Sequence, residues 1–348
     1  MNVLLWHLHG SWTSAFVQGP HRYLLPTVPG RGPWGSGRPS ACTWPAHAVD
    51  VQPERLADTD VDIVVLQRPE EIALADRWLR RTPGREVAAV YVEHDVPHEA
   101  AATSRHPMTD RDDMTLVHIS PFNALMWDSG RTRTAVVEHG ILDPGRRYTG
   151  ELPAAATVVN EPMRHSRTAG TDLLPGLARG APLDVFGRGT EGLGMRLGAA
   201  TRIQGRGDLP QSRMHDELAR RRVYLHPMRW SSLGLALIEA MQLGLPVVAL
   251  ATSGAAAAVP PEAGVSATDP ERLADALREL VADPARARAH GAVARAHAVR
   301  RYGLPRFLRD WDAVLHQATA DHRRRRPRDI RRRATHLRVV RPAVEPRR

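Results

Sequence analysis

Residues 226–249 read His-Pro-Met-Arg-Trp-Ser-Ser-Leu-Gly-Leu-Ala-Leu-Ile-Glu-Ala-Met-Gln-Leu-Gly-Leu-Pro-Val-Val-Ala. A short apolar run at residues 223–225 precedes this stretch, and a second apolar run occupies residues 246–250. Between them, the apolar pattern of residues 235–243 predicts a buried helix. A buried helix between two continuous apolar strands is typical of a parallel sheet covered on both faces. The stretch therefore predicts an α/β fold.

The same alternation runs along the whole chain and restarts near residue 150. Strands are predicted at residues 3–8, 61–66, 88–92, 115–119, 134–137, 156–159, 183–186, 201–203, 223–225 and 246–250. Helices are predicted at residues 70–79, 171–177, 211–220, 235–243, 270–281, 284–299 and 304–318. Glycine, proline and arginine at residues 26–45 predict a long surface loop.

The restart predicts two doubly wound, Rossmann-like domains that face each other across a cleft. The first spans residues 1–150 and the second residues 151–302, with residues 151–153 as a linker. A terminal helix at residues 303–320 carries an apolar face and is expected to pack back toward the first domain. Residues 321–348 form a basic tail. In doubly wound sheets, ligands lie at the carboxyl ends of the strands, which here border the cleft.

The positive charge is concentrated in this tail. The chain has 348 residues, and its formal net charge is 48 − 38 = +10. Residues 323–348 contain twelve arginines and two acidic residues, so the tail alone carries 12 − 2 = +10. A block of like charge predicts disorder. The tail could contact a membrane surface or another polyanion, but the neutral body predicts no specific nucleic-acid binding.

The chain contains no lysine, so all of its basic residues are arginines. This excludes a P-loop and a pyridoxal Schiff base, because both need a lysine. The single cysteine, Cys42, excludes an internal disulfide and a cysteine cluster for zinc. The N-terminus has no basic segment ahead of its apolar run, so no secretory signal is predicted and a cytoplasmic location is expected.

The loop and helix at residues 231–239 combine features of an anion site and a polar contact. Ser231 or Ser232 is placed to cap the helix. Leu233 and Gly234 then lie at the helix start, where free amides favour an anion. Glu239 follows among apolar residues, and a buried carboxylate needs a hydrogen-bonding partner. Either the two hydroxyls of a ribose or a structural arginine would meet that need.

The whole stretch resembles the donor-site signature of GT-B glycosyltransferases of the retaining family four, the glycosyl transferases of group 1. Their signature reads Glu-Gly-Phe-Gly, four residues, Glu-Ala-Met, and then Gly-x-Pro-Val-Val-Ala. The resemblance implies that Glu239 binds the nucleotide ribose and that the amides of Leu233 and Gly234 hold the diphosphate. Ser231 stands where the family has its first glutamate, which contacts the donor sugar, and Ser232 follows it in the same donor loop.

A second resemblance concerns the cations around the diphosphate. The family has an arginine followed by a lysine after the first strand of the second domain, and Arg164 and Ala169 occupy those positions. Two cations normally neutralise the departing diphosphate. Because the lysine is replaced, we expect Arg167 or Arg229 to supply the second charge.

Shorter segments resemble other parts of the family's site. His94 follows a predicted strand in Glu-His-Asp and matches a histidine that reaches the transferred sugar. Gly10 matches the first glycine loop beside the diphosphate and the acceptor, and Ser11 and Trp12 are expected to contact the acceptor with His94. Gly187 and Arg188 match a glycine turn that borders the base. The resemblance covers residues 3 to about 315, and it implies His94, Arg164 and Glu239 as catalytic residues.

These observations predict a glycosyltransferase that moves a sugar from a nucleoside-diphosphate sugar to an unidentified acceptor. The resemblance implies that the stereochemistry is retained and that neither a metal nor a cofactor is needed. One alternative is a nucleotide-sugar epimerase on the same scaffold, since a fold does not fix a reaction. Another is a non-enzymatic protein that binds polyanions through its arginine-rich tail.

Overall fold

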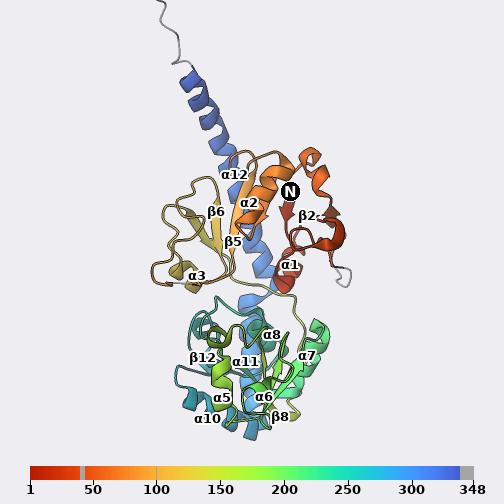
Figure 1. The fold of residues 1–348 in the computed structure, drawn as a ribbon, viewed down its shortest axis with the longest axis vertical. Helices are drawn as coiled ribbons and strands as arrows, with labels where there is room; N and C mark the ends of the chain where they lie inside the picture. The colour runs from red at the N-terminus through yellow and green to blue at the C-terminus, as the bar shows by residue number, and fades with distance from the viewer. Residues whose placement is uncertain (40–43, 99, 338–348) are drawn as a thin grey trace, which may run out of the picture.

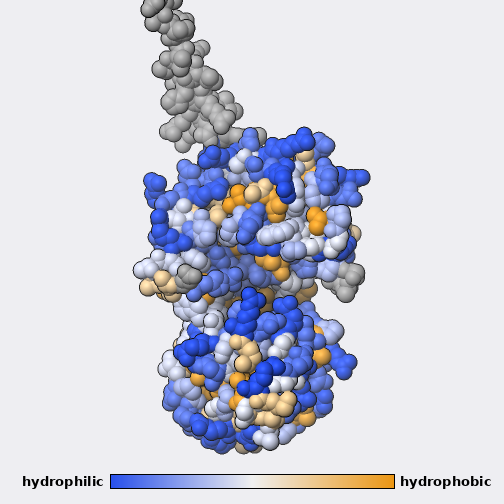
Figure 2. All heavy atoms as spheres, in the orientation of Figure 1, coloured by the Kyte–Doolittle hydropathy of each residue, from blue (hydrophilic) through white to orange (hydrophobic). Residues whose placement is uncertain are grey.

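The computed structural model describes residues 1–39, 44–98 and 100–337, with the side chains of these described up to residue 325. Two lobes are stacked along the long axis, and the last helix runs from the lower lobe past the upper one (Figure 1). The lobes meet at a narrow waist (Figure 2). Each lobe is built around one parallel sheet, so the chain has two α/β domains.

The first sheet has seven strands in the order β3-β2-β1-β4-β5-β6-β7, all parallel. Its strands are β1 (Asn2–Leu5), β2 (Arg22–Pro26), β3 (Ala48–Val51), β4 (Ile63–Leu66), β5 (Ala88–Glu93), β6 (Thr115–His118) and β7 (Arg133–Val136). The intervening helices are α1 (Gly10–Phe16), η1 (Pro29–Arg31), η2 (Pro53–Asp58), α2 (Glu70–Leu79) and α3 (Pro121–Met126). The central strands β4 and β5 are buried along their whole length, because both faces of the sheet are covered.

The second sheet has six parallel strands in the order β10-β9-β8-β11-β12-β13. Its strands are β8 (Leu152–Val158), β9 (Leu183–Phe186), β10 (Ile203–Gly207), β11 (Arg221–His226), β12 (Val247–Leu250) and β13 (Gly264–Ala267). The helices are α4 (Ser166–Ala169), η3 (Thr171–Leu173), α5 (Leu174–Leu177), α6 (Leu193–Arg196), α7 (Gln211–Arg220), α8 (Leu235–Leu243), α9 (Ala255–Ala258), η4 (Pro261–Ala263), α10 (Pro270–Ala282) and α11 (Pro284–Tyr302). Both sheets change direction of winding beside their first strand, which puts the loops after β1, β8 and β11 at the interface.

The last helix, α12 (Leu304–Leu337), returns to the first domain. Its aromatic face, formed by Phe307 and Trp311, lies in the same hydrophobic core as Trp12 and Phe16. A Cβ atom on Gly140 would lie 2.2 Å from the Cβ of Phe307, so only glycine permits this close approach. The helix therefore fastens the chain after the second domain to the first.

The structure corrects several boundaries. The helix continues to Leu337 instead of ending at residue 320, so the segment expected to be a disordered tail from residue 321 begins as helix. The beginning of this segment is held in place because Asp321 and His322 are buried against the first domain. The expected linker at residues 151–153 overlaps strand β8, which pairs with β11. The remaining part of the predicted tail, residues 338–348, lies outside the described residues.

Other differences concern elements that the apolar pattern does not reveal. Strands β2 and β3 flank the predicted loop at residues 26–45 and complete one edge of the first sheet. The predicted helix at residues 171–177 is divided into the short turns η3 and α5. Within the described ranges, none of the helices is both long enough and apolar enough to cross a lipid bilayer.

Candidate active site

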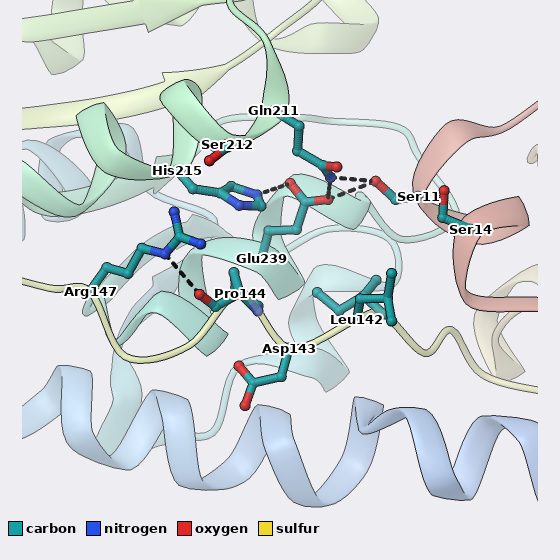
Figure 3. A pocket seen from close by; sticks show the side chains of 11 residues that line it. Ser11, Ser14, Leu142, Asp143, Pro144, Arg147, Gln211, Ser212, His215 and Glu239 are labelled. Atoms are coloured by element: carbon teal, nitrogen blue, oxygen red, sulfur yellow. Dashed lines mark hydrogen bonds and ion pairs between the residues drawn. The ribbon is translucent and has the colours of Figure 1, made fainter. Parts of the chain in front are cut away.

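Glu239 lies at the interface of the two domains and is 4% exposed. Ser11, at the start of α1 in the first domain, donates a hydrogen bond from Oγ to Oε1 of Glu239 over 2.8 Å. Gln211 donates from Nε2 to the same oxygen over 2.9 Å, and His215 Nε2 lies 3.2 Å from Oε2 (Figure 3). Among the described residues, the hydrogen-bonding partners of this carboxylate are therefore a serine, an amide and an imidazole, and not an arginine.

These side chains border a cavity of about 170 Å³ between the domains. Its walls come from α1, α7, α8 and the segment that joins the domains (Figure 3). The lining residues are Ser11, Ser14, Ile141, Leu142, Asp143, Pro144, Arg147, Gln211, Ser212, His215 and Glu239. Pockets for ligands of drug size usually measure about 300–1,000 Å³. The cavity is smaller than that range, and the Glu239 carboxylate lies at its wall.

Helix α8, which carries Glu239, begins without a side-chain cap. Its N-cap residue is Gly234, and no side chain accepts from its first amides. A Cβ atom on Gly234 would lie 3.2 Å from Cε1 of His226, so a larger residue would crowd the strand end. The uncapped amides and the helix dipole favour an anion at this point.

The expected capping role of Ser231 or Ser232 is wrong. The hydroxyl of Ser232 instead donates to the backbone carbonyl of His94 in the first domain. Ser231 donates from its backbone N–H to Oγ of Ser253 over 3.2 Å. Leu233 is 5% exposed and packs in the core of the second domain. The loop before α8 is therefore fixed by contacts on either side of the interface, which leaves the helix start open.

His94 follows β5 and is buried at the same interface. Its Nε2 lies 3.1 Å from Oε1 of Gln67, and its ring centroid is 4.1 Å from that of His9. Burial, followed by the nearby His9 and His139, lowers the pKa of His94 well below its ordinary value. A neutral imidazole in this position can exchange hydrogen bonds with a sugar, but it carries no positive charge near neutral pH.

The predicted cations lie on two loops that contact each other. Arg229 donates from both Nη atoms to the carboxylate of Asp172, and Arg167 lies 3.4 Å from the same carboxylate. Arg164 is exposed on the turn before α4. Arg164, Arg167 and Arg229 stand against Glu161 and Asp172, so these loops carry a net charge of 3 − 2 = +1.

The loops are held together by backbone contacts. Arg229 donates from its backbone N–H to the carbonyl of Thr168 over 2.9 Å. A Cβ atom on Gly170 would lie 1.9 Å from the carbonyl oxygen of Pro227, so the loops touch at a glycine. Ala169, at the position of the family's lysine, is 7% exposed and belongs to the core of this domain. This chain thus has a core alanine where the family has its lysine, and Arg167 and Arg229 lie on the adjoining loops.

The remaining predicted residues differ in their surroundings. Gly187 has a φ of +120°, and a Cβ atom there would lie 2.5 Å from the carbonyl oxygen of Val159, so the turn after β9 requires glycine. Arg188 is exposed beside it. Gly10 starts α1 with open space around the position of a Cβ atom. Open space at Gly10 leaves room for a ligand near the first turn of α1.

Trp12 does not line the cleft. It has no exposed surface, stacks on Phe16 with ring centroids 4.8 Å apart, and meets Trp311 edge-on. This corrects the expectation that Trp12 contacts an acceptor, because its ring is occupied by the core that α12 completes. Sequence reasoning also missed Gln211 and His215, whose spacing of four on one helix was the available signal.

Comparison with known proteins agrees with this geometry. Residues 171–283 match the model of the family described as glycosyl transferases group 1. The match covers 113 of the 348 residues, about a third of the chain. It includes the loop before α8, Glu239 and both α7 partners.

A curated glycosyltransferase is similar in sequence to part of this chain, and solved structures are similar to it in fold. A D-inositol 3-phosphate glycosyltransferase of Streptomyces griseus is 34% identical over 140 residues, which is 39% of this chain and 29% of that enzyme. Sucrose-phosphate synthase from Thermosynechococcus elongatus superposes with a TM-score of 0.66 at 16% identity, covering 93% of this chain and 98% of the other. Anabaena HepE in complex with UDP and glucose gives 0.64 at 15% identity, covering 91% and 100%. The chain therefore has the GT-B fold over the 91–93% of its length that these structures cover.

Proposed function

We propose that this chain is a group 1 glycosyltransferase, which transfers a glycosyl group from a nucleoside-diphosphate sugar to an acceptor with retention of configuration and without a metal ion. The observation that carries the proposal is the position of Glu239, buried at the interface beside the uncapped start of α8. A carboxylate suits the two hydroxyls of a ribose, and the helix start suits a diphosphate. The two groups are joined in a nucleoside diphosphate.

The donor would lie mainly on the second domain. The amides of Leu233 and Gly234 would bind the diphosphate, and the loops carrying Arg164 and Arg229 would neutralise the charge that develops as it leaves. The bond between the sugar C1 and the diphosphate oxygen breaks, and the acceptor oxygen forms a new bond at C1 on the same face. The arginines take the part that a metal ion plays in other transferases, because both stabilise the negative charge of the leaving group.

The acceptor would approach from the first domain, past Gly10 and His94. His94 is neutral, so we expect it to bind the transferred sugar and not to act as an acid. The relatives give the first donors to test: structures of Anabaena HepE contain UDP or UDP-glucose. The arginine-rich end of the chain can contact a polyanionic acceptor or a membrane surface, and the donor site does not depend on that contact.

Glu239→Gln tests the donor site directly. Wild-type protein should bind one of UDP, GDP and ADP in a saturable way, measured by titration calorimetry. The variant keeps the shape of the side chain but loses its charge, so the preferred nucleotide should bind about tenfold more weakly. Glu279→Gln on α10, where the carboxylate is 41% exposed, is the matched control and should bind like wild type. The proposal fails if none of the three nucleotides binds, or if Glu239→Gln binds as tightly as wild type.

Slow hydrolysis of the donor tests retention without knowledge of the acceptor. If UDP is the preferred nucleotide, proton NMR of UDP-glucose with the protein should show α-glucose before mutarotation. Release of β-glucose would contradict retention. An isomerised nucleotide sugar formed without any acceptor would instead show the epimerase alternative.

A further inference from the structure

Two residues of α7 hold the Glu239 carboxylate from one side. Gln211 and His215 are four residues apart, so their side chains lie on the same face of the helix. The Gln211 amide contacts Oε1 over 2.9 Å, and the His215 imidazole is 3.2 Å from Oε2. Each oxygen of Glu239 is therefore paired with a different residue of one rigid element (Figure 3).

This pairing fixes the plane of a group that would otherwise rotate. The His215 and Glu239 side chains are only 9% and 5% exposed, so water reaches them poorly. An ionised carboxylate has about four acceptor positions, two on each oxygen. Gln211 and His215 of α7 occupy one acceptor position on each oxygen, so about one acceptor position on each oxygen remains. A vicinal diol needs two acceptors placed side by side.

One of these remaining positions is taken by Ser11. Its hydroxyl donates to Oε1 of Glu239 and also accepts from Nε2 of Gln211 over 2.9 Å. A hydroxyl from the first domain thus lies where a ribose hydroxyl of a bound donor is expected. This contact shows that the geometry set by α7 accepts a hydroxyl group.

We propose that His215 and Gln211 are positioning residues that orient the Glu239 carboxylate toward both hydroxyls of the donor ribose, and thereby make the site selective for ribonucleotides. The inference rests on the proposed function. It adds that selectivity for the ribose depends on the two α7 side chains that hold Glu239. A merely structural role of the same contacts would lower stability without changing the preference between sugars.

The experiment compares ribonucleotide with dideoxynucleotide binding in three His215 backgrounds. His215→Leu removes the donor to Oε2, and His215→Gln replaces it with an amide of similar reach. His316→Gln, at an imidazole that is 64% exposed on α12, is the control. The probes are the nucleoside diphosphate preferred by wild type and its 2′,3′-dideoxy analogue, for example UDP and dideoxy-UDP. Dissociation constants come from calorimetry, and circular dichroism melting shows whether each variant is folded.

Wild type and the control should bind the ribonucleotide about tenfold or more tightly than the dideoxy analogue. His215→Leu should lose most of that preference by binding the ribonucleotide more weakly, with the dideoxy affinity unchanged. His215→Gln should restore it. In a donor assay, the change should appear in KM for the donor more than in kcat, because the diol is present throughout the reaction.

An unchanged preference in folded His215→Leu would overturn the inference. So would an equal loss of affinity for both nucleotides, which would indicate a general structural role. If His215→Leu does not fold, the same comparison is made with Gln211→Ala, which removes the α7 donor to Oε1. If wild type binds the diphosphate without preferring the ribonucleotide, only this inference is wrong. If wild type binds no nucleotide at all, the proposed function is wrong as well.

Discussion

At the scale of single residues, the site is organised by what Glu239 touches. A carboxylate that is almost fully buried is stable only with several hydrogen bonds, and the three described donors provide them. Two come from the same domain and one, Ser11, from the other. Binding of a donor ribose would displace Ser11 and so exchange a contact between domains for a contact with the ligand.

Ser11→Ala should therefore bind nucleotide more tightly. Removing the hydroxyl abolishes a hydrogen bond that competes with the ribose, and such a bond contributes about 1 kcal/mol, or about fivefold in affinity. Calorimetric titration with the preferred diphosphate measures the change. Ser14→Ala is the control, because Ser14 lines the same cavity but accepts from Trp44 Nε1 instead of touching Glu239. Weaker binding in Ser11→Ala would show that Ser11 assists the nucleotide.

At the scale of elements, we expect the two arginine loops and the start of α8 to bind the diphosphate together. Arg229 connects them, because its side chain pairs with Asp172 near α4 while its backbone precedes α8. The pairing limits the rotation of the guanidinium, and it leaves the loops with a net positive charge. Arg167 shares the same aspartate from a position that is 80% exposed. We therefore expect Arg229 to contribute more to diphosphate binding than Arg167.

Arg229→Gln should weaken diphosphate binding about tenfold and leave uridine binding unchanged if the preferred base is uracil. Loss of a charge-assisted hydrogen bond accounts for this magnitude. The affinity of wild type should also fall with added salt more steeply than that of the variant, since exposed charges are screened. Arg272→Gln on α10, at a side chain 46% exposed, is the control. An equal effect on uridine and its diphosphate would indicate that the loop has been disturbed as a whole.

At the scale of the whole molecule, the sequence predicted the elements better than their contacts. The apolar runs of β9 and α8 and the amphipathic pattern of α7 place those elements at their observed bounds. Buried elements appear in a sequence as continuous apolar runs, and surface helices appear as periodic patterns. Strand β2 was missed because its five residues join a loop rich in glycine and proline. The resemblance drew attention to Glu239, but no pattern shows that Ser11, 228 residues away, would contact it. That contact depends on how the domains pack.

The wrong prediction that Ser231 or Ser232 caps α8 also arose because the packing of the two domains cannot be read from the sequence. A serine before an apolar helix is a strong capping signal when the helix end faces solvent. Here Ser232 is 8% exposed and faces the first domain, so its hydroxyl bonds to the carbonyl of His94. Trp12 is the converse case. It follows Ser11, which borders the cavity, but its ring is buried in a core completed by α12 from the far end of the chain. Contacts between distant segments decided both positions.

Burial of His226 and His139 makes the stability of the folded chain depend on pH. Burial lowers the pKa of His226 to about 4 and that of His139, with additional effects of His9 and Arg306, to about 3. Both ring nitrogens of His226 are buried and have no hydrogen-bonding partner among the described residues. A folded-state pKa below the unfolded value of about 6.5 means that the unfolded chain binds more protons. Stability is therefore complete above about pH 6.5 and decreases as the pH falls toward the folded-state values.

His226→Asn should flatten this dependence. By linkage, the lowered pKa of His226 removes about 2 kcal/mol of stability between pH 7.5 and pH 5, and His139 adds a similar loss. Asparagine does not titrate there, so the melting temperature of the variant should fall less over this range, even if its value at pH 7.5 is lower. Circular dichroism melts at half-unit steps of pH measure both slopes. Exposed His316→Asn is the control and should keep the wild-type slope. Parallel slopes for wild type and His226→Asn would mean that His226 is protonated in the folded chain or that the interface opens before it titrates.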